Sequence, residues 1–294
     1  MTAGWYRWRT CGDVFNLYTA HAPWYGRVVD AAMRGTQTTL KGWLQSTRGM
    51  FCETRRPLPG IVVSLFDRHG LSLLPWKLKG YRCISIVERS SRGKTPIVSG
   101  VEVLELRHVN ADSIQEQLPD ARDVAFVIGL PPCRDLCSAG ARWWKRKGAK
   151  DPEFQKRAVE TLNELLDMLD NFGVPYAVLV PASSRTLLNR PYQRVSPHEF
   201  GRYIPERSPH PLFPNVIPFN DAYTKRTFLY GGCGFVLPWK APVPPVFTRI
   251  VLKSGKTKRI TPIMASRKST QTRCVAPLGL CSAIAQMHAS DYAS

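Results

Sequence analysis

The chain has 294 residues, of which 41 are Lys or Arg and 22 are Asp or Glu, so its formal net charge is +19. This length allows one large α/β domain with an appended lobe, or two modest domains, and excludes a small fold whose core depends on disulfides. The charge favours a polyanionic partner. Because no window approaches ~20 apolar residues, we expect that partner to be nucleic acid rather than a membrane.

Eight cysteines are scattered along the chain and follow no secreted spacing. Only Cys133 and Cys137 are close together, and no second pair completes a zinc set. The N-terminus lacks the continuous apolar core of a signal peptide. We therefore expect a reduced, cytoplasmic protein without a structural metal, in which Cys137 is structural.

Residues 1–58 are rich in Trp, Arg and Thr, carry a weak helical pattern at 27–44, and end at a break near Pro57. This pattern predicts an N-terminal basic and aromatic extension. Four roles stay open for it: a clamp on DNA, an oligomerisation arm, a contact with a protein partner, and packing on the main domain.

Four short apolar runs predict the first strands of a sheet, at residues 61–66, 82–87, 101–106 and 125–129. The first run ends in the turn Asp67-Arg68-His69-Gly70, and a helix follows from Leu71 to Gly80. The second run ends on Glu88, and the fourth leads into Pro131-Pro132-Cys133. Strands that alternate with helices and end on acidic residues indicate an α/β fold with a Rossmann-like, doubly wound sheet. Ligands of such a sheet lie beyond the carboxyl ends of its strands.

Downstream, we expect a helix that begins at the N-cap Asp151 and ends at Gly173. Its apolar face comprises Ala158, Leu162, Leu165, Leu166 and Leu169. Residues 174–180 predict a fifth strand. Residues 181–245 contain many Pro, Arg, Tyr and Phe residues with little periodicity, which predicts a loop-rich lobe. The last elements expected are a hairpin of residues 248–251 and 257–260 and a terminal helix at 277–288.

A series of short segments follows in one order along the chain. They are Ser64-Leu65-Phe66-Asp67-Arg68-His69-Gly70, Pro75-Trp76, Gly80-Tyr81, Glu88, Asp112, Pro131-Pro132-Cys133, Ser138-Ala139-Gly140-Ala141-Arg142-Trp143, Pro197-His198-Glu199-Phe200-Gly201, Asp221-Ala222-Tyr223-Thr224-Lys225-Arg226-Thr227 and Thr272-Arg273-Cys274-Val275-Ala276-Pro277-Leu278-Gly279. In this order they resemble the DNA (cytosine-5) methyltransferases, above all the compact branch found in bacteriophages and prophages. The resemblance covers roughly residues 60–287.

The resemblance implies a Rossmann-like S-adenosylmethionine-dependent methyltransferase fold with a small, loop-rich second lobe. It divides the chain into the extension at 1–58, a cofactor-binding and catalytic core at 59–180, a DNA-facing lobe at 181–262, and a C-terminal helix that returns to the core at 263–294. If the chain is phage-encoded, its expected location is the cytoplasm of a bacterial host cell.

The resemblance also implies which residues bind S-adenosylmethionine: Phe66, Asp67, Gly70, Trp76, Glu88, Asp112 and Pro131, with Trp76 near the adenine or against the sheet. Independently of the family, Glu88 stands about 20 residues after the glycine turn, where a carboxylate can accept hydrogen bonds from ribose hydroxyls. The alternative for such a strand-end acid is a solvated residue or a helix cap.

The catalytic residues implied by the resemblance are Cys133, its neighbour Pro132, and Arg226. In the family a thiolate adds to carbon 6 of a flipped-out cytosine, and carbon 5 then takes the methyl group. A rigid turn at a strand end, with Arg134 and Arg142 nearby, predicts a lowered pKa for the Cys133 thiol. The alternative is that Cys133 is a small apolar filler.

Two positions depart from the family pattern. The family has Glu-Asn-Pro where this chain has Leu179-Val180-Pro181, so the carboxylate that holds the cytosine is lost. The middle glycine of the Phe-x-Gly-x-Gly turn is Arg68, whose side chain either narrows the cofactor site or points into solvent. Glu199 and Asp221 are the candidates to replace the carboxylate, but we expect both at the surface.

A basic run, Trp143-Trp144-Lys145-Arg146-Lys147-Gly148-Ala149-Lys150, follows the Cys133 turn. Lys and Arg bind phosphates and Trp stacks on bases, so this run is expected to contact DNA. The expected DNA contacts are Arg142, Trp143, Lys145, Arg146, Lys147 and Lys225. The DNA is either a duplex with one base flipped out or a single strand. The alternative is a solvated loop with Trp143 folded into the core.

Two hypotheses about function follow. The first is an enzyme that modifies carbon 5 of a pyrimidine in DNA, including a base other than cytosine. The second is a catalytically degenerate protein of the same fold that binds DNA or a protein partner in a structural or regulatory role. Cys133 and Glu88 favour the first, whereas Leu179-Val180 and Arg68 favour the second.

Overall fold

The computed structural model describes residues 60–89, 98–183, 186–251, 254–265, 272 and 274–289. All of them belong to one compact unit of the chain, Thr54–Ser294. The predicted extension at residues 1–58, with its helical pattern at 27–44, lies outside the described residues.

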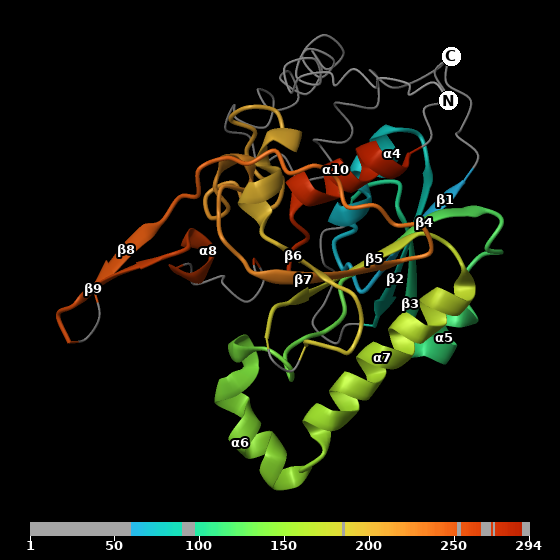
Figure 1. The fold of residues 1–294 in the computed structure, drawn as a ribbon, viewed down its shortest axis with the longest axis horizontal. Coiled ribbons are helices and arrows are strands. Elements are labelled where there is room, and N and C mark those ends of the chain that lie inside the picture. Colours follow the sequence, from blue (N-terminus) through green and yellow to red (C-terminus); the bar gives the residue numbers. More distant parts are fainter. Residues whose placement is uncertain are drawn as a thin grey trace, which may run out of the picture. The chain divides into compact units, whose positions relative to one another are not determined.

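A seven-stranded sheet with the order β3-β2-β1-β4-β5-β7-β6 forms the centre of this unit (Figure 1). Its strands are β1 Ile61–Leu65, β2 Arg82–Glu88, β3 Glu102–Leu106, β4 Val124–Gly129, β5 Tyr176–Pro181, β6 Gln193–Val195 and β7 Thr227–Gly232. Strands β1 to β5 pair in parallel, and β7 runs antiparallel to β5 and β6. The predicted α/β class and mostly parallel sheet are confirmed, and the architecture is compatible with a Rossmann-like fold.

The sheet has a point at which the direction of winding reverses. From β1 the chain adds β2 and β3 on one side and then returns to add β4 and β5 on the other. In open sheets of this kind, ligands bind outside the carboxyl ends of the strands at such a switch point. The two turns at this place follow β1 and β4, and they contain the predicted cofactor turn at Asp67 and the predicted nucleophile, Cys133.

Both faces of the sheet are covered by apolar side chains, which explains why the central strands read as continuous apolar runs. Because neighbouring side chains in a strand point to opposite faces, Val63 and Val62 belong to separate core clusters. The cluster around Val63 includes Leu166 of α7 (Phe154–Phe172), whereas the cluster around Val62 includes Ile284 of α10 (Leu278–His288). Helix α7 therefore covers one face and α10 the other, as Figure 1 shows.

The other helical segments are short. They are η1 Leu71–Leu73, α4 Leu74–Leu78, α5 Ala111–Gln115, η2 Ser138–Gly140, α6 Ala141–Lys150, η3 Pro197–Tyr203, η4 Phe219–Asp221 and α8 Pro262–Ala265. Helix α10 packs against α4, η1 and η3, so the C-terminal helix lies beside the segment that follows β1. Among the described helices, none has the length and apolar composition needed to cross a bilayer.

The predicted start of the long helix was wrong. Helix α7 begins at Phe154, whereas Asp151 is the C-cap of α6. The Asp151 carboxylate accepts a hydrogen bond from the Glu153 amide at 3.2 Å and pairs with Arg157. The predicted end is confirmed, because Gly173 takes the left-handed conformation, with φ 76°, that glycine adopts without strain. The predicted apolar face is buried at Leu162, Leu165, Leu166 and Leu169.

The region predicted to form a loop-rich lobe contributes two strands, β6 and β7, to the main sheet. Strand β7 pairs with β5 in the register Pro181↔Thr227, so residues 193–195 and 227–232 are part of the core sheet and not of a separate lobe. The predicted hairpin is confirmed as β8 (Thr248–Val251) paired with β9 (Thr257–Ile260). The predicted terminal helix is confirmed as α10.

Candidate active site at the carboxyl ends of β1, β4 and β5

The turn after β1 is built around a buried carboxylate. Asp67 accepts hydrogen bonds from the Ser72 amide at 2.7 Å, the Ser72 hydroxyl at 2.6 Å and the His69 amide at 3.2 Å. Two residues of the turn are left-handed, Phe66 and Gly70, both with φ 64°. Such a conformation is strained for Phe, and strain of this kind gathers at functional sites. The Asp67 carboxylate therefore shapes the turn and is already occupied by bonds within it.

The other residues predicted to bind the cofactor lie at different strand and helix ends and differ in their exposure to solvent. Glu88 lies at the end of β2 with an exposed side chain, and Asp112 is exposed in the first turn of α5. Pro131 is half-buried at the end of β4, beside the exposed Pro132. Of the two alternatives for Arg68, narrowing the cofactor site or pointing into solvent, the structure has the second, because the side chain is exposed.

Of the two positions expected for Trp76, near the adenine or against the sheet, the structure has the second. Trp76 is fully buried and stacks on Phe126 with ring centroids 5.2 Å apart. It also makes an edge contact with Tyr81 at 5.3 Å, and Tyr81 precedes β2 at the amino end of that strand. The Trp76 ring on α4 therefore covers a face of the sheet near the amino end of β2. The carboxyl ends of the parallel strands, where the cofactor is expected, lie at the opposite end of the sheet.

Cys133 stands at the start of a tight turn after β4. Its carbonyl oxygen accepts hydrogen bonds from the amides of Leu136 at 3.0 Å and Cys137 at 2.9 Å. The side chain of Cys133 is half-buried, and the Cys137 thiol donates to its sulfur across 3.8 Å. The sequence spacing of four residues thus becomes a direct contact between two thiols.

The predicted lowering of the Cys133 pKa was wrong. The hydrogen bond with Cys137 and the burial of the thiol raise the pKa of Cys133 well above its ordinary value, and together they outweigh the lowering by the Lys225 ammonium. Arg134 and Arg142, the two arginines expected to lower it, have exposed side chains and are not among the groups that shift the pKa of this thiol. Little thiolate is therefore present at neutral pH in the free protein.

The loop after β5 and the start of β7 meet the Cys133 turn. The Ser183 hydroxyl donates a 2.7 Å hydrogen bond to the carbonyl of Leu136, and the Ala182 amide donates to the Arg226 carbonyl at 3.0 Å. The antiparallel pairing of β5 with β7 brings residues 225–226 beside the end of β5. Lys225 is half-buried and acts electrostatically on Cys133, while the side chain of Arg226 is exposed.

Leu179 and Val180, which stand where the family has Glu and Asn, have apolar side chains and lie among other apolar side chains. Leu179 is 5% exposed and Val180 is 1% exposed, and they belong to the two opposite core clusters. Leu179 pairs with Leu229 of β7 in the sheet. A carboxylate at position 179 would therefore lie among apolar side chains.

Asp221, expected at the surface, is fully buried. Its carboxylate accepts the Gly279 amide at 2.9 Å at the start of α10, and burial raises its pKa to about 6. Burial also lowers the pKa of Lys225, and the neighbouring thiols and Asp221 oppose that shift. Lys225 thus lies in a shared electrostatic environment with Cys133 and Asp221. No local sequence pattern indicates this arrangement, because the pieces come from distant segments.

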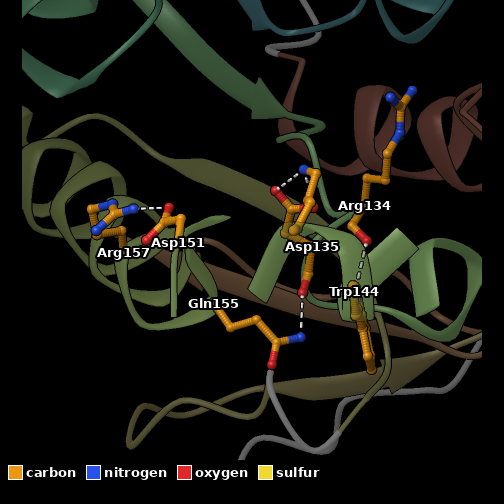
Figure 2. Close-up of polar contacts among 7 residues, drawn as sticks. Arg134, Asp135, Trp144, Asp151, Gln155 and Arg157 are labelled. Carbon is orange, nitrogen blue, oxygen red and sulfur yellow. Dashed lines mark hydrogen bonds and ion pairs between the residues drawn. The ribbon is translucent and has the colours of Figure 1, made fainter. Parts of the chain in front are cut away.

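Helices α6 and α7 contact the Cys133 turn through three side chains, Lys147 and Trp144 of α6 and Gln155 of α7 (Figure 2). The Lys147 ammonium bonds both carboxylate oxygens of Asp135, at 2.5 and 2.7 Å. Gln155 donates to the Asp135 carbonyl at 3.0 Å, and Trp144 donates to the Arg134 carbonyl at 3.4 Å. Figure 2 shows the Arg134 side chain pointing away from these contacts. A movement of α6 would therefore move the turn that carries Cys133.

The basic run is a helix, α6, and not a loop, and Trp143 is 39% exposed rather than folded into the core. The guanidinium groups of Arg142 and Arg146 each lie 5.0 Å from the centroid of the Trp143 ring. Lys145 is also exposed. Lys147 differs from these residues because it is engaged by Asp135. The exposed face of α6 thus presents cations around one aromatic ring.

The fold and this site define a class of protein. It is an α/β protein with a mostly parallel sheet, and at the switch point it carries the half-buried Cys133, the buried Cys137 and a neighbouring lysine, Lys225. Comparison of the chain with protein-family models and with curated proteins finds no match. In the part of the chain that the structure covers, no three His, Cys, Asp or Glu side chains are grouped as a metal ion would require.

Proposed function

We propose that the chain is an S-adenosylmethionine-dependent, methyltransferase-type protein that acts on carbon 5 of a pyrimidine in DNA, with Cys133 as the nucleophile. The observation that carries the proposal is the position of Cys133: it follows β4 at the switch point, next to the left-handed turn that follows β1. The resemblance of the ordered segments to DNA (cytosine-5) methyltransferases supports the same reading. A cytoplasmic location goes with this proposal.

The chemistry uses groups of the chain in defined roles. The Cys133 sulfur bonds to ring carbon 6, and the electron pair of the carbon 5–carbon 6 double bond moves to carbon 5. Lys225, close to the sulfur, favours the thiolate that this attack needs. After carbon 5 has gained its substituent, loss of the carbon 5 proton expels the thiolate and restores the double bond. S-adenosylmethionine would supply the electrophilic methyl group.

The residues around the switch point fit this cofactor in part. At the end of β2, Glu88 offers an exposed carboxylate to which no described residue bonds, where a ribose hydroxyl can donate. The solvent-facing Arg68 leaves the turn uncovered. Asp67 is occupied by Ser72, and Trp76 lies in the core, so neither is a direct contact in this proposal.

Replacing Glu88 by Ala is expected to weaken binding of S-adenosylmethionine by about 1.5–3 kcal/mol, since a hydrogen bond to a charged group is lost. Titration calorimetry with S-adenosylmethionine and with its demethylated product measures this loss. Glu116→Ala, an exposed acid at the end of α5, is the matched control and should bind as the native chain does. Equal affinities for the two variants would remove Glu88 from the cofactor site.

Reversing the charge of Lys145 and Arg146 to Glu is expected to weaken DNA binding and to flatten its dependence on salt. Each phosphate neutralised on a duplex contributes a slope of about −0.9 to the logarithm of affinity against that of salt concentration. The matched control reverses two other exposed cations, Arg107 and Arg122, with the same change in net charge. Fluorescence anisotropy at several salt concentrations compares them, and equal slopes would argue against α6 as the DNA surface.

The proposal is tested without cofactor by exchange of the hydrogen on carbon 5. When a thiolate adds to carbon 6, carbon 5 can take a proton from solvent and then lose its own, so DNA with tritium on carbon 5 should release tritium to water. The release should accelerate with rising pH, because the raised pKa of Cys133 limits the thiolate. Cytosine and uracil substrates report which base is accepted. Release that is unchanged in Cys133→Ser would refute the proposal.

A catalytically degenerate binding protein is the second candidate, and two observations favour it. The free Cys133 thiol has a raised pKa, and Leu179 lies in an apolar cluster where the family has its carboxylate. Loss of a general acid typically costs about 10²–10⁴-fold in rate. DNA binding with the α6 dependence described above, together with no tritium release from either base, would favour this candidate.

A further inference from the structure

The thiols of Cys133 and Cys137 lie close together in the turn that follows β4. Their sulfur atoms are 3.8 Å apart, and the chain between them forms one turn closed by the hydrogen bond from the Cys137 amide to the Cys133 carbonyl. A disulfide needs about 2.05 Å between sulfurs, so each sulfur has to move only a short way. Residues 134–136 form a turn outside any helix or strand, which leaves the backbone able to adjust.

We propose that Cys133 and Cys137 are a redox modification site, in which a hydroperoxide oxidises the pair to a reversible intramolecular disulfide. Cys133 is the first to react, because it is half-buried whereas Cys137 is 6% exposed. Cys137 is the resolving thiol, because its sulfur already faces that of Cys133. The disulfide does not depend on the proposed function, although it would occupy the sulfur that this function needs.

The reaction has two balanced steps. In the first, the small fraction of Cys133 that is ionised attacks the peroxide, a sulfur–oxygen bond forms as the oxygen–oxygen bond breaks, and the departing alkoxide, or hydroxide from hydrogen peroxide, takes the proton that the thiol lost. In the second, the Cys137 sulfur attacks the sulfenic sulfur of Cys133, the sulfur–oxygen bond breaks, and hydroxide leaves with the Cys137 proton as water. The sulfur pair loses two electrons, and the peroxide gains them.

Trypsin offers a direct readout, because it cuts after Arg134, between the two cysteines. The cysteines then lie in separate peptides, residues 123–134 and 135–142, which stay together only through a disulfide. The native chain is treated with a limited amount of hydrogen peroxide, blocked with N-ethylmaleimide and digested without reductant. We expect the two peptides to appear in the mass spectrum as one species that a thiol separates.

Two variants sharpen the test. In Cys137→Ser, oxidation should stop at the sulfenic acid of Cys133, which dimedone labels. In Cys274→Ser, which removes the exposed thiol that also acts on Cys133, the linked peptides should still form. Linkage of Cys133 to the Cys274 peptide, or Cys137 that remains open to N-ethylmaleimide after Cys133 is oxidised, would overturn the proposal. The native chain alone decides between these results if a variant fails to fold.

Discussion

Replacing Asp221 by Ala is expected to lower the free energy of unfolding by about 1.5–3 kcal/mol. The fully buried carboxylate accepts the amides that begin α10, including that of Gly279 at 2.9 Å, and loss of such a cap costs about 0.5–2 kcal/mol. Asp221 also has a φ of 48°, a left-handed conformation that strains Ala by roughly 1 kcal/mol more. Denaturant unfolding at pH 7 measures the loss.

Asp221→Asn is the matched variant, because Asn keeps an oxygen acceptor and tolerates the left-handed conformation. Burial raises the pKa of Asp221 from 3.8 to about 6, so between these values the folded chain holds a proton that the unfolded chain has released. This group therefore makes the native chain lose stability as the pH rises from about 4 to about 6. Asn should remove that slope. An Ala variant as stable as the native chain, or an Asn variant with an unchanged slope, would contradict the role given to Asp221.

Much of the sheet follows from the sequence alone. Strands β1, β2 and β4 are short β-branched runs bounded by Gly, Pro or charged residues, and burial on both faces makes such runs visible without any partner. The β8–β9 hairpin is equally predictable from the sequence, since a turn with Gly255 separates the two four-residue strand patterns at 248–251 and 257–260. In contrast, β6 has only three residues, and β7 is a strand because it pairs with β5 and β6, which no local pattern records.

The sequence alone predicts where the candidate site residues lie in the fold, but it does not predict their pKa values. The positions of Cys133 after β4 and of Glu88 at the end of β2 follow from strand order, because carboxyl ends meet at one edge of a parallel sheet. The pKa of Cys133 depends on a sulfur 3.8 Å away and on burial, and a spacing of four residues fixes neither. Likewise, Asp221 is charged in sequence but buried in the fold, because it caps a helix that begins more than fifty residues later.

Mutation of Cys133 to Ser is expected to abolish covalent capture of a pyrimidine, the largest effect in this account. A hydroxyl at this position is a far weaker nucleophile than a thiol, whose thiolate adds readily to an activated ring carbon. Cys137→Ala should keep capture, and it should shift capture to lower pH, because it removes the hydrogen bond with Cys137 that is the main cause of the raised Cys133 pKa. The pair of variants separates the nucleophile from its neighbour.

The most direct measurement uses DNA that carries a 5-fluoropyrimidine, together with S-adenosylmethionine. Fluorine on carbon 5 cannot leave as a proton does, so the bond between Cys133 and carbon 6 becomes permanent and survives a denaturing gel. The account predicts a slowly migrating adduct with the native chain, on a fluorocytosine or a fluorouracil site, and none with Cys133→Ser. A native chain that binds both DNA and cofactor yet forms no adduct with either base would contradict the claim that Cys133 is a nucleophile.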